Sequence, residues 1–208
     1  MDKSITAILI KAEEWRDYDY RVTLFSAEGM VKAVMRGVRK KDAKLKFAAQ
    51  PFALCSYEIS TRNNNVVTGA SMIESLSQIA NDIDKFKVGC LVLECVEQAS
   101  SAVESSELFL TLLKSLKALL YSAVNPRLIG IKFLQKVLFD TGFCRFDMEN
   151  RDVATVSGLL GAVASSTLTE LDRIEASEED INAALIRTAT LFEQNLDCEL
   201  KTKRGFTR

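Results

Sequence analysis

The stretch YRVTLFSAEGMVKAVM, residues 20–35, decides the fold because it contains two short strands and the turn that joins them. In its first half, Val22 and Leu24 alternate with residues of the opposite face, which is the two-residue period of a half-buried strand. The pair Glu28-Gly29 is a hairpin signal, and residues 30–35 follow it as a second strand. This stretch therefore predicts a β-hairpin.

Three further segments extend the hairpin into a sheet. Ser4–Ala12 is β-rich and mostly apolar, Phe52–Thr61 reads as a fourth strand, and Val66–Met72 returns as a fifth after three asparagines that favour a turn. Five short strands, with a basic stretch between the third and the fourth, are what a small Greek-key barrel of the OB type needs. The same pattern of strands is also compatible with an SH3-like barrel.

From Ile73 onward the apolar period becomes helical. The sequence predicts four helices, and between the third and fourth, at residues 143–176, only short helices and loops. The helices cover Ile83–Ala99, burying Phe86, Cys90 and Leu93; Glu107–Ala123, capped by Ser105 or Ser106; the segment from Asn125-Pro126 to Gly142; and a last helix that Ser177 caps. The expected fold class is α+β, with an N-terminal five-stranded OB-type barrel at residues 1–75 and an α-helical domain at residues 76–208.

Composition narrows the classes of function. The 208 residues are 48% apolar, enough for a sizeable core, and carry a formal charge of −1. No apolar run approaches the roughly 20 residues that a membrane span requires, and the N-terminus lacks the pattern of a signal peptide. We therefore expect a cytoplasmic protein.

The reactive side chains favour binding over catalysis. The sequence has no histidine, which removes Ser-His and Cys-His nucleophile pairs and the commonest metal ligand. Five cysteines without a C-x-x-C pair fit reduced, buried thiols better than disulfides or zinc. The acidic pairs Glu13-Glu14 and Glu178-Glu179 are adjacent in sequence and so do not share a face. We expect no enzyme activity, cofactor or metal.

The most unusual feature is the basic loop, MRGVRKKDAKLK, residues 35–46. Only Asp42 opposes its six cations, which are Arg36, Arg39, Lys40, Lys41, Lys44 and Lys46. A charge run can be simply a solvated surface. On a small barrel, however, such a loop would border a groove that follows a nucleic-acid backbone, without reading base sequence. The alternative is a protein adaptor whose barrel docks an acidic partner.

Aromatic residues that could stack on bases lie near this loop. Trp15, Tyr18 and Tyr20 are expected in a polar loop between the first two strands, and Phe47 and Phe52 flank the basic loop. The alternative for Trp15 and Phe52 is a place in the core of the barrel.

Several motifs in order resemble one family. They are TAILIK at residues 6–11, DYDYRVTLFSAEG at 17–29, RGVRK at 36–40, QPF at 50–52, the helix PRLIGIKFLQKVLFDTGF from residue 126 and the ending LFEQNLDCELKTKR from residue 191. Together they resemble the bacterial recombination mediator RecO family over most of the chain. Each motif alone is weak, and the specificity lies in their order and spacing.

The resemblance implies a non-enzymatic protein associated with the bacterial nucleoid. Family members bind single- and double-stranded DNA, anneal complementary strands and, with RecR, help load RecA onto strands coated by the single-stranded-DNA-binding protein, SSB. For this sequence, the resemblance implies that the six cations of the basic loop contact DNA.

The resemblance also implies a site for the acidic SSB C-terminal tail on the helical domain. The residues that match are Arg127, Lys132, Phe133 and Lys136, and the alternative for Lys136 is a pair with Asp140 on an exposed face. Many members carry a four-cysteine zinc module after the central helix. Here the corresponding stretch has Cys144 and no second cysteine before Cys198, so we expect no metal.

Overall fold

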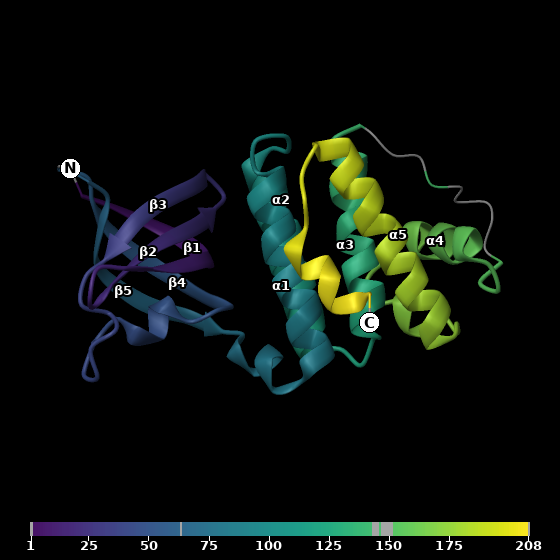
Figure 1. Cartoon of the computed structure of the whole chain (residues 1–208), viewed down its shortest axis with the longest axis horizontal. Helices are drawn as coiled ribbons and strands as arrows, with labels where there is room; N and C mark the ends of the chain where they lie inside the picture. Colours follow the sequence, from purple (N-terminus) through teal and green to yellow (C-terminus); the bar gives the residue numbers. More distant parts are fainter. Residues whose placement is uncertain (1, 63, 143–145, 147–151, 208) are drawn as a thin grey trace. The chain divides into compact units, whose positions relative to one another are not determined.

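The computed structural model describes residues 2–62, 64–142, 146 and 152–207 (Figure 1). The chain folds into two compact units. One comprises Met1–Gln78 with Ser105–Leu110, and the other comprises Ile79–Glu104 with Thr111–Arg208. The expected boundary between residues 75 and 76 falls at the end of the last strand.

Five strands close a barrel in the first unit (Figure 1). They are β1 (Asp2–Trp15), β2 (Asp19–Ser26), β3 (Gly29–Met35), β4 (Ala53–Ser60) and β5 (Val66–Ser75), in the spatial order β1-β2-β3-β5-β4. The pairing of β3 with β5 is parallel and the others are antiparallel. This Greek-key order confirms the predicted fold class, an OB-type barrel followed by helices.

The first strand is longer than its apolar pattern predicts. Its first half pairs with β4 and its second half with β2, where Trp15 lies opposite Asp19. The expectation that Trp15 and Tyr20 lie in a loop is therefore wrong: Trp15 ends β1, Tyr20 belongs to β2, and Tyr18 lies in the turn between them. Cross-strand pairing carries β1 past the point where its apolar residues stop.

The barrel core is built from inward-facing residues of all five strands. It includes Val22 and Leu24 of the hairpin, and a short 3-10 helix, η1 (Lys46–Ala49), contributes Ala48. The buried hydroxyl of Tyr57 donates to the carbonyl oxygen of Ala48 at 2.8 Å. Burial raises the pKa of Tyr57 far above its ordinary value, so the phenol stays a neutral donor.

Replacing Tyr57 with phenylalanine should destabilise the protein by about 1–3 kcal/mol, because the buried Ala48 carbonyl would lose its donor. Urea denaturation would measure the change. Tyr18, which is 53% exposed, offers the matched control, and Tyr18→Phe should stay within about 0.5 kcal/mol of the parent. Equal stabilities of the two variants would contradict a stabilising role for this hydrogen bond.

The helices are α1 (Ile83–Ala99), α2 (Ser105–Tyr121), α3 (Pro126–Asp140), α4 (Val156–Ser165) and α5 (Glu178–Leu196), with 3-10 turns η2 (Ser77–Asn81), η3 (Leu171–Arg173) and η4 (Lys201–Phe206). In the second unit, α3 packs against α1, α4 and α5. A Cβ atom on Gly130 of α3 would lie 3.0 Å from Val88 and 3.4 Å from Leu185. Glycine at this position therefore allows α3 to approach both neighbours closely.

Helix caps test the predicted helix starts. Asn125 accepts a hydrogen bond from the amide of Arg127, and Ser177 accepts one from the amide of Asp180, so both predicted caps are confirmed. The prediction for α2 is wrong, because Ser105 is already helical and Glu104 occupies the N-cap position.

The predicted buried face of α1 is also rotated from the observed one. Phe86 and Cys90 are only half-buried, whereas Val88, Leu91 and Cys95 are buried. Leu93, the third residue predicted to be buried, is buried as well.

The stretch from residue 143 to 176 contains α4 and η3 where it is described, and Cys144 lies outside the described residues. Within the described part of the chain, none of the helices has the length and hydropathy needed to cross a membrane.

Candidate nucleic-acid interface

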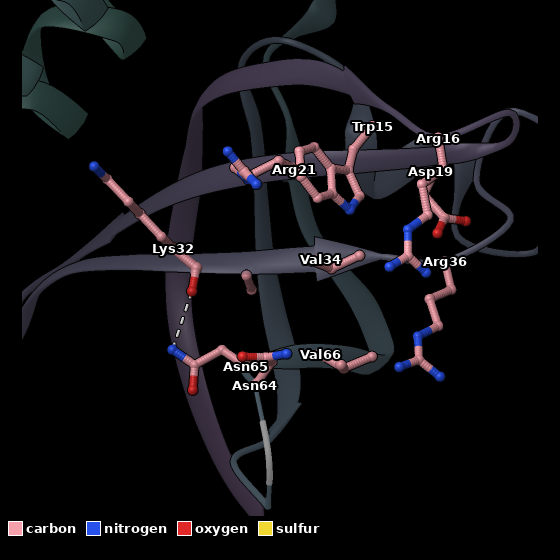
Figure 2. Close-up of a pocket in the computed structure, with 11 residues that line it drawn as sticks. Trp15, Arg16, Asp19, Arg21, Lys32, Val34, Arg36, Asn64, Asn65 and Val66 are labelled. Carbon is pink, nitrogen blue, oxygen red and sulfur yellow. Dashed lines mark hydrogen bonds between the residues drawn. The ribbon is translucent and has the colours of Figure 1, made fainter.

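The barrel carries a groove lined by β2 and β3, the end of β1 and the start of β5 (Figure 2). We call it the barrel groove; its volume is about 610 Å³. Eleven residues line it: Trp15, Arg16, Asp19, Arg21, Lys32, Ala33, Val34, Arg36, Asn64, Asn65 and Val66. This is the place where OB folds bind oligonucleotides, on the face of strands 2 and 3 between the first and the last hairpin loops.

One wall of the barrel groove is a stacked pair. The guanidinium carbon of Arg21 lies 3.8 Å from the centre of the Trp15 ring, and Figure 2 shows the two groups side by side. Trp15 remains 38% exposed, so the ring is not a core residue. An exposed aromatic face next to a cation is suited to stacking with an unpaired base.

Cations lie at both ends of the barrel groove. Figure 2 shows Arg16 and Arg36 close to Asp19 at one end and Lys32 at the other. The side-chain amide of Asn65 donates a hydrogen bond to the backbone carbonyl oxygen of Lys32 at 3.0 Å, which connects the segment before β5 to β3. Lys and Arg outnumber Asp and Glu in residues 1–78 but not in the rest of the chain, so the cationic excess lies in the barrel segment.

The predicted site residues leave out six charged or polar side chains of this groove. They are Arg16, Asp19, Arg21, Lys32, Asn64 and Asn65. The hairpin register carried a usable signal for two of them: Val22 and Ala33 face the core, so Arg21 and Lys32 face outward from adjacent strands. The positions of the other four depend on how the turns and loops fold.

The first half of the basic loop is fastened to the turn between β1 and β2. The amide of Gly37 donates to a carboxylate oxygen of Asp19 at 2.7 Å, and the amide of Arg39 donates to the carbonyl of Tyr18 at 3.0 Å. Gly37 has a φ of 64°, a left-handed conformation that favours glycine within the RGVRK motif. Lys40 lies 5.5 Å from the centre of the Tyr18 ring.

All six predicted DNA contacts are exposed, and those that line hollows do not all line the same one. Arg36 lines the barrel groove, and with Lys40 it also lines a neighbouring hollow of about 480 Å³. Lys46 instead borders a separate pocket of about 350 Å³ with Phe47 and Met72. Arg39 forms an ion pair with Glu14 at 2.9 Å, and Lys41 and Lys44 are exposed.

The flanking aromatic residues divide between surface and core. Phe52 is fully buried, as its alternative interpretation predicted, and so is not available to a base. Phe47 packs partly buried against the barrel core. Tyr18 is 53% exposed and Tyr20 is half-buried.

The residues matched to an SSB-tail site do not form an open apolar pocket beside free cations. Phe133 is buried, with 1% of its surface exposed. The ammonium group of Lys132 donates to the carbonyl oxygens of Val163 and Ala164 at the end of α4, and burial lowers its pKa.

The two remaining matches have acidic partners. Arg127 bridges Asp84 at 3.0 Å and Glu178 at 2.6 Å, which joins the starts of α1, α3 and α5. Lys136 pairs with Asp140, the alternative that the spacing had left open. A docking tail would have to compete with these partners.

The four cysteines among the described residues have thiols whose pKa is raised, not lowered. Burial raises the pKa of Cys55, Cys90, Cys95 and Cys198, so these side chains stay protonated near neutral pH. Among the described residues, His, Cys, Asp and Glu side chains form no group of three or more that could hold a metal ion. Cys144 lies outside those residues.

Comparison with known proteins finds a family model that matches the barrel segment. Residues 1–76 match the family model described as Recombination protein O N terminal. The chain is 29% identical over 140 residues to the DNA repair protein RecO of Syntrophomonas wolfei, an alignment that covers 66% of this chain and 56% of that protein.

Two further relatives are also described as DNA repair protein RecO. The protein of Heliobacterium modesticaldum is 28% identical over 142 residues, covering 66% of this chain and 50% of the relative. That of Thermoanaerobacter sp. is 27% identical over 140 residues, with coverages of 66% and 56%. The chain spans about half the length of the curated relatives it matches. The barrel at residues 1–76 therefore belongs to the family of RecO N-terminal domains, and the chain as a whole is similar to RecO proteins.

Proposed function

We propose that this protein is a cytoplasmic recombination mediator. It binds single- and double-stranded DNA, anneals complementary strands and, with RecR, helps load RecA onto strands coated by SSB. The observation that carries the proposal is the barrel groove, where a tryptophan and four cations occupy the face that OB folds use for oligonucleotides. Similarity to relatives that are described as DNA repair proteins supports it.

Phosphate neutralisation supplies the binding energy in this proposal. Each Lys or Arg that pairs with a phosphate releases condensed counterions, and this term does not depend on sequence. Arg36 at the barrel groove and Lys40 at the neighbouring hollow, with the exposed Lys41 and Lys44, provide such contacts for single or double strands.

Annealing needs no bond to be made or broken. Two strands repel each other through their phosphates, and a protein that neutralises both backbones lowers that repulsion. The protein therefore acts as a binding protein and not as an enzyme. Its partners RecR, RecA and SSB come from the family resemblance, and the SSB-tail site at Arg127, Lys132, Phe133 and Lys136 stays a prediction.

The first experiment is fluorescence anisotropy with a labelled single-stranded DNA at stepped salt concentrations. We expect a steep linear fall of log K with log salt, with a slope of about 0.7 for each phosphate neutralised. No binding at low salt would contradict the proposal and leave the basic loop as a surface for an acidic protein. A strand-annealing assay with complementary oligonucleotides follows a positive result.

Replacing Trp15 with alanine should weaken single-strand binding by about 1–3 kcal/mol and affect duplex binding much less, because only an unpaired base offers its face for stacking. Trp15 is the sole tryptophan, so its own fluorescence quenching in the parent protein gives a second readout. Tyr121→Ala is the control, since this exposed aromatic residue at the end of α2 does not line the barrel groove. Equal losses for single strands and duplex would contradict base stacking.

A further inference from the structure

The guanidinium group of Arg39 already has contacts within the protein. One terminal guanidinium nitrogen lies 2.9 Å from a carboxylate oxygen of Glu14, and the other donates to the carbonyl oxygen of Asp17 at 3.4 Å. The guanidinium carbon also lies 5.9 Å from the centre of the Tyr20 ring. Three contacts therefore hold the group against β1, the following turn and β2.

The backbone around Arg39 is fastened to the same turn. Its amide donates to Tyr18, and two residues earlier the amide of Gly37 donates to Asp19. These bonds set the direction in which Arg36 and Lys40 leave the loop, and both side chains line the hollows beside the turn. The Arg39 side chain and these two backbone bonds thus form one junction between the loop and the turn, next to Arg36 and Lys40 in sequence.

A phosphate contact by Arg39 would compete with these partners. The planar guanidinium group has five N–H donors in a fixed fork, and Glu14 and Asp17 each engage one terminal nitrogen, so a bidentate phosphate would have to use the remaining donors or displace a partner. The side chain is 30% exposed, against 68% for Glu14.

We infer that Arg39 is a positioning residue: through Glu14 and the β1–β2 turn it orients Arg36 and Lys40 toward DNA, and it does not itself neutralise a phosphate. This inference rests on the proposed function. It differs from the expectation that all six cations of the basic loop contact DNA, because it gives Arg39 a different role.

The test compares Arg39→Gln, Glu14→Gln, the double variant and Lys40→Gln by anisotropy with single-stranded DNA at stepped salt. Glu13→Gln is the matched control, because Glu13 is an exposed neighbour on β1 that pairs with Lys11 at 2.9 Å and not with the loop. It reports the general effect of removing one negative charge beside the groove.

If Arg39 positions the loop, Arg39→Gln should bind about threefold more weakly than the parent, and Glu14→Gln about threefold more weakly than Glu13→Gln. The double variant should bind DNA no more weakly than the weaker-binding of the two single variants, because each single substitution already removes the same junction. The salt slope should stay at the parental value in Arg39→Gln but fall by about 0.7 in Lys40→Gln. A slope that falls equally in Arg39→Gln, with Glu14→Gln tighter than Glu13→Gln, would overturn the inference.

Two further readouts separate positioning from a general loss of structure. The charge-swapped variant Glu14→Arg with Arg39→Glu should recover at least half of the lost binding on a logarithmic scale, whereas no recovery would count against the junction. Hydrogen exchange of the Arg39 amide should be faster in Glu14→Gln than in Glu13→Gln. Because exchange needs no DNA, unchanged exchange would overturn the inference even if DNA binding holds. Faster exchange without any DNA binding would keep the structural junction but overturn the proposed function and the role toward DNA that depends on it.

Discussion

Replacing Lys40, Lys41 and Lys44 together with glutamate is expected to weaken binding to single-stranded DNA by more than about 100-fold at moderate salt. All three side chains are exposed, and Lys40 also borders the hollow next to the barrel groove. The change removes three cations and places three anions where phosphates would lie. The log-log salt slope should fall by about 2 because three neutralised phosphates are lost. Anisotropy titrations at stepped salt give both numbers.

The control must change the net charge equally without touching the loop. Lys114, Arg187 and Lys201 are exposed on the helical elements, and their replacement with glutamate makes the same change in formal charge. We expect that variant to bind within about threefold of the parent, because screening over about 10 Å at 0.1 M salt limits the reach of charges outside the binding surface. Comparable losses in both variants would mean that overall charge, and not the basic loop, governs binding. Circular dichroism of each variant checks that the fold is retained.

Local sequence patterns correctly predicted those parts of the fold that depend on residues close together in the chain. The hairpin from residue 20 to 35 follows from alternation and a turn, and the caps Asn125 and Ser177 follow from side chains that reach the nearest free amides. The length of β1 could not be predicted in this way, because Trp15 is strand only by virtue of its partner Asp19 on β2.

The candidate site was only partly predictable for the same reason. Charge density along the chain identified the basic loop, but it could not show that Arg39 faces Glu14, 25 positions earlier in the sequence, or that Lys46 borders a different pocket from Arg36. The groove residue Lys32 is isolated in sequence, and only the register of β2 and β3 brings it near Arg21.

Helix α3 shows the limit of spacing arguments most clearly. Lys132, Phe133 and Lys136 are close in sequence and were expected together on one docking face. In fact the helix is central to its unit, and Phe133 lies among buried neighbours such as Ile129, Leu134 and Val137. A helix that is covered on several sides has no single apolar stripe, so periodicity cannot tell a docking face from a core face.

Replacing Phe133 with alanine is therefore expected to destabilise the helical unit by about 3–5 kcal/mol, because it removes a fully packed aromatic ring and leaves a cavity. Urea denaturation followed by circular dichroism would measure the loss. Phe139→Ala on the same helix is the matched control: its ring is 71% exposed, and the change should stay within about 0.5 kcal/mol. An SSB-tail peptide adds a second readout. Normal stability in Phe133→Ala, combined with lost peptide binding, would show that the ring serves a docking surface and not the core. Lost stability, with Phe139→Ala unaffected, would mean that any tail site on this unit must be built from residues other than Phe133.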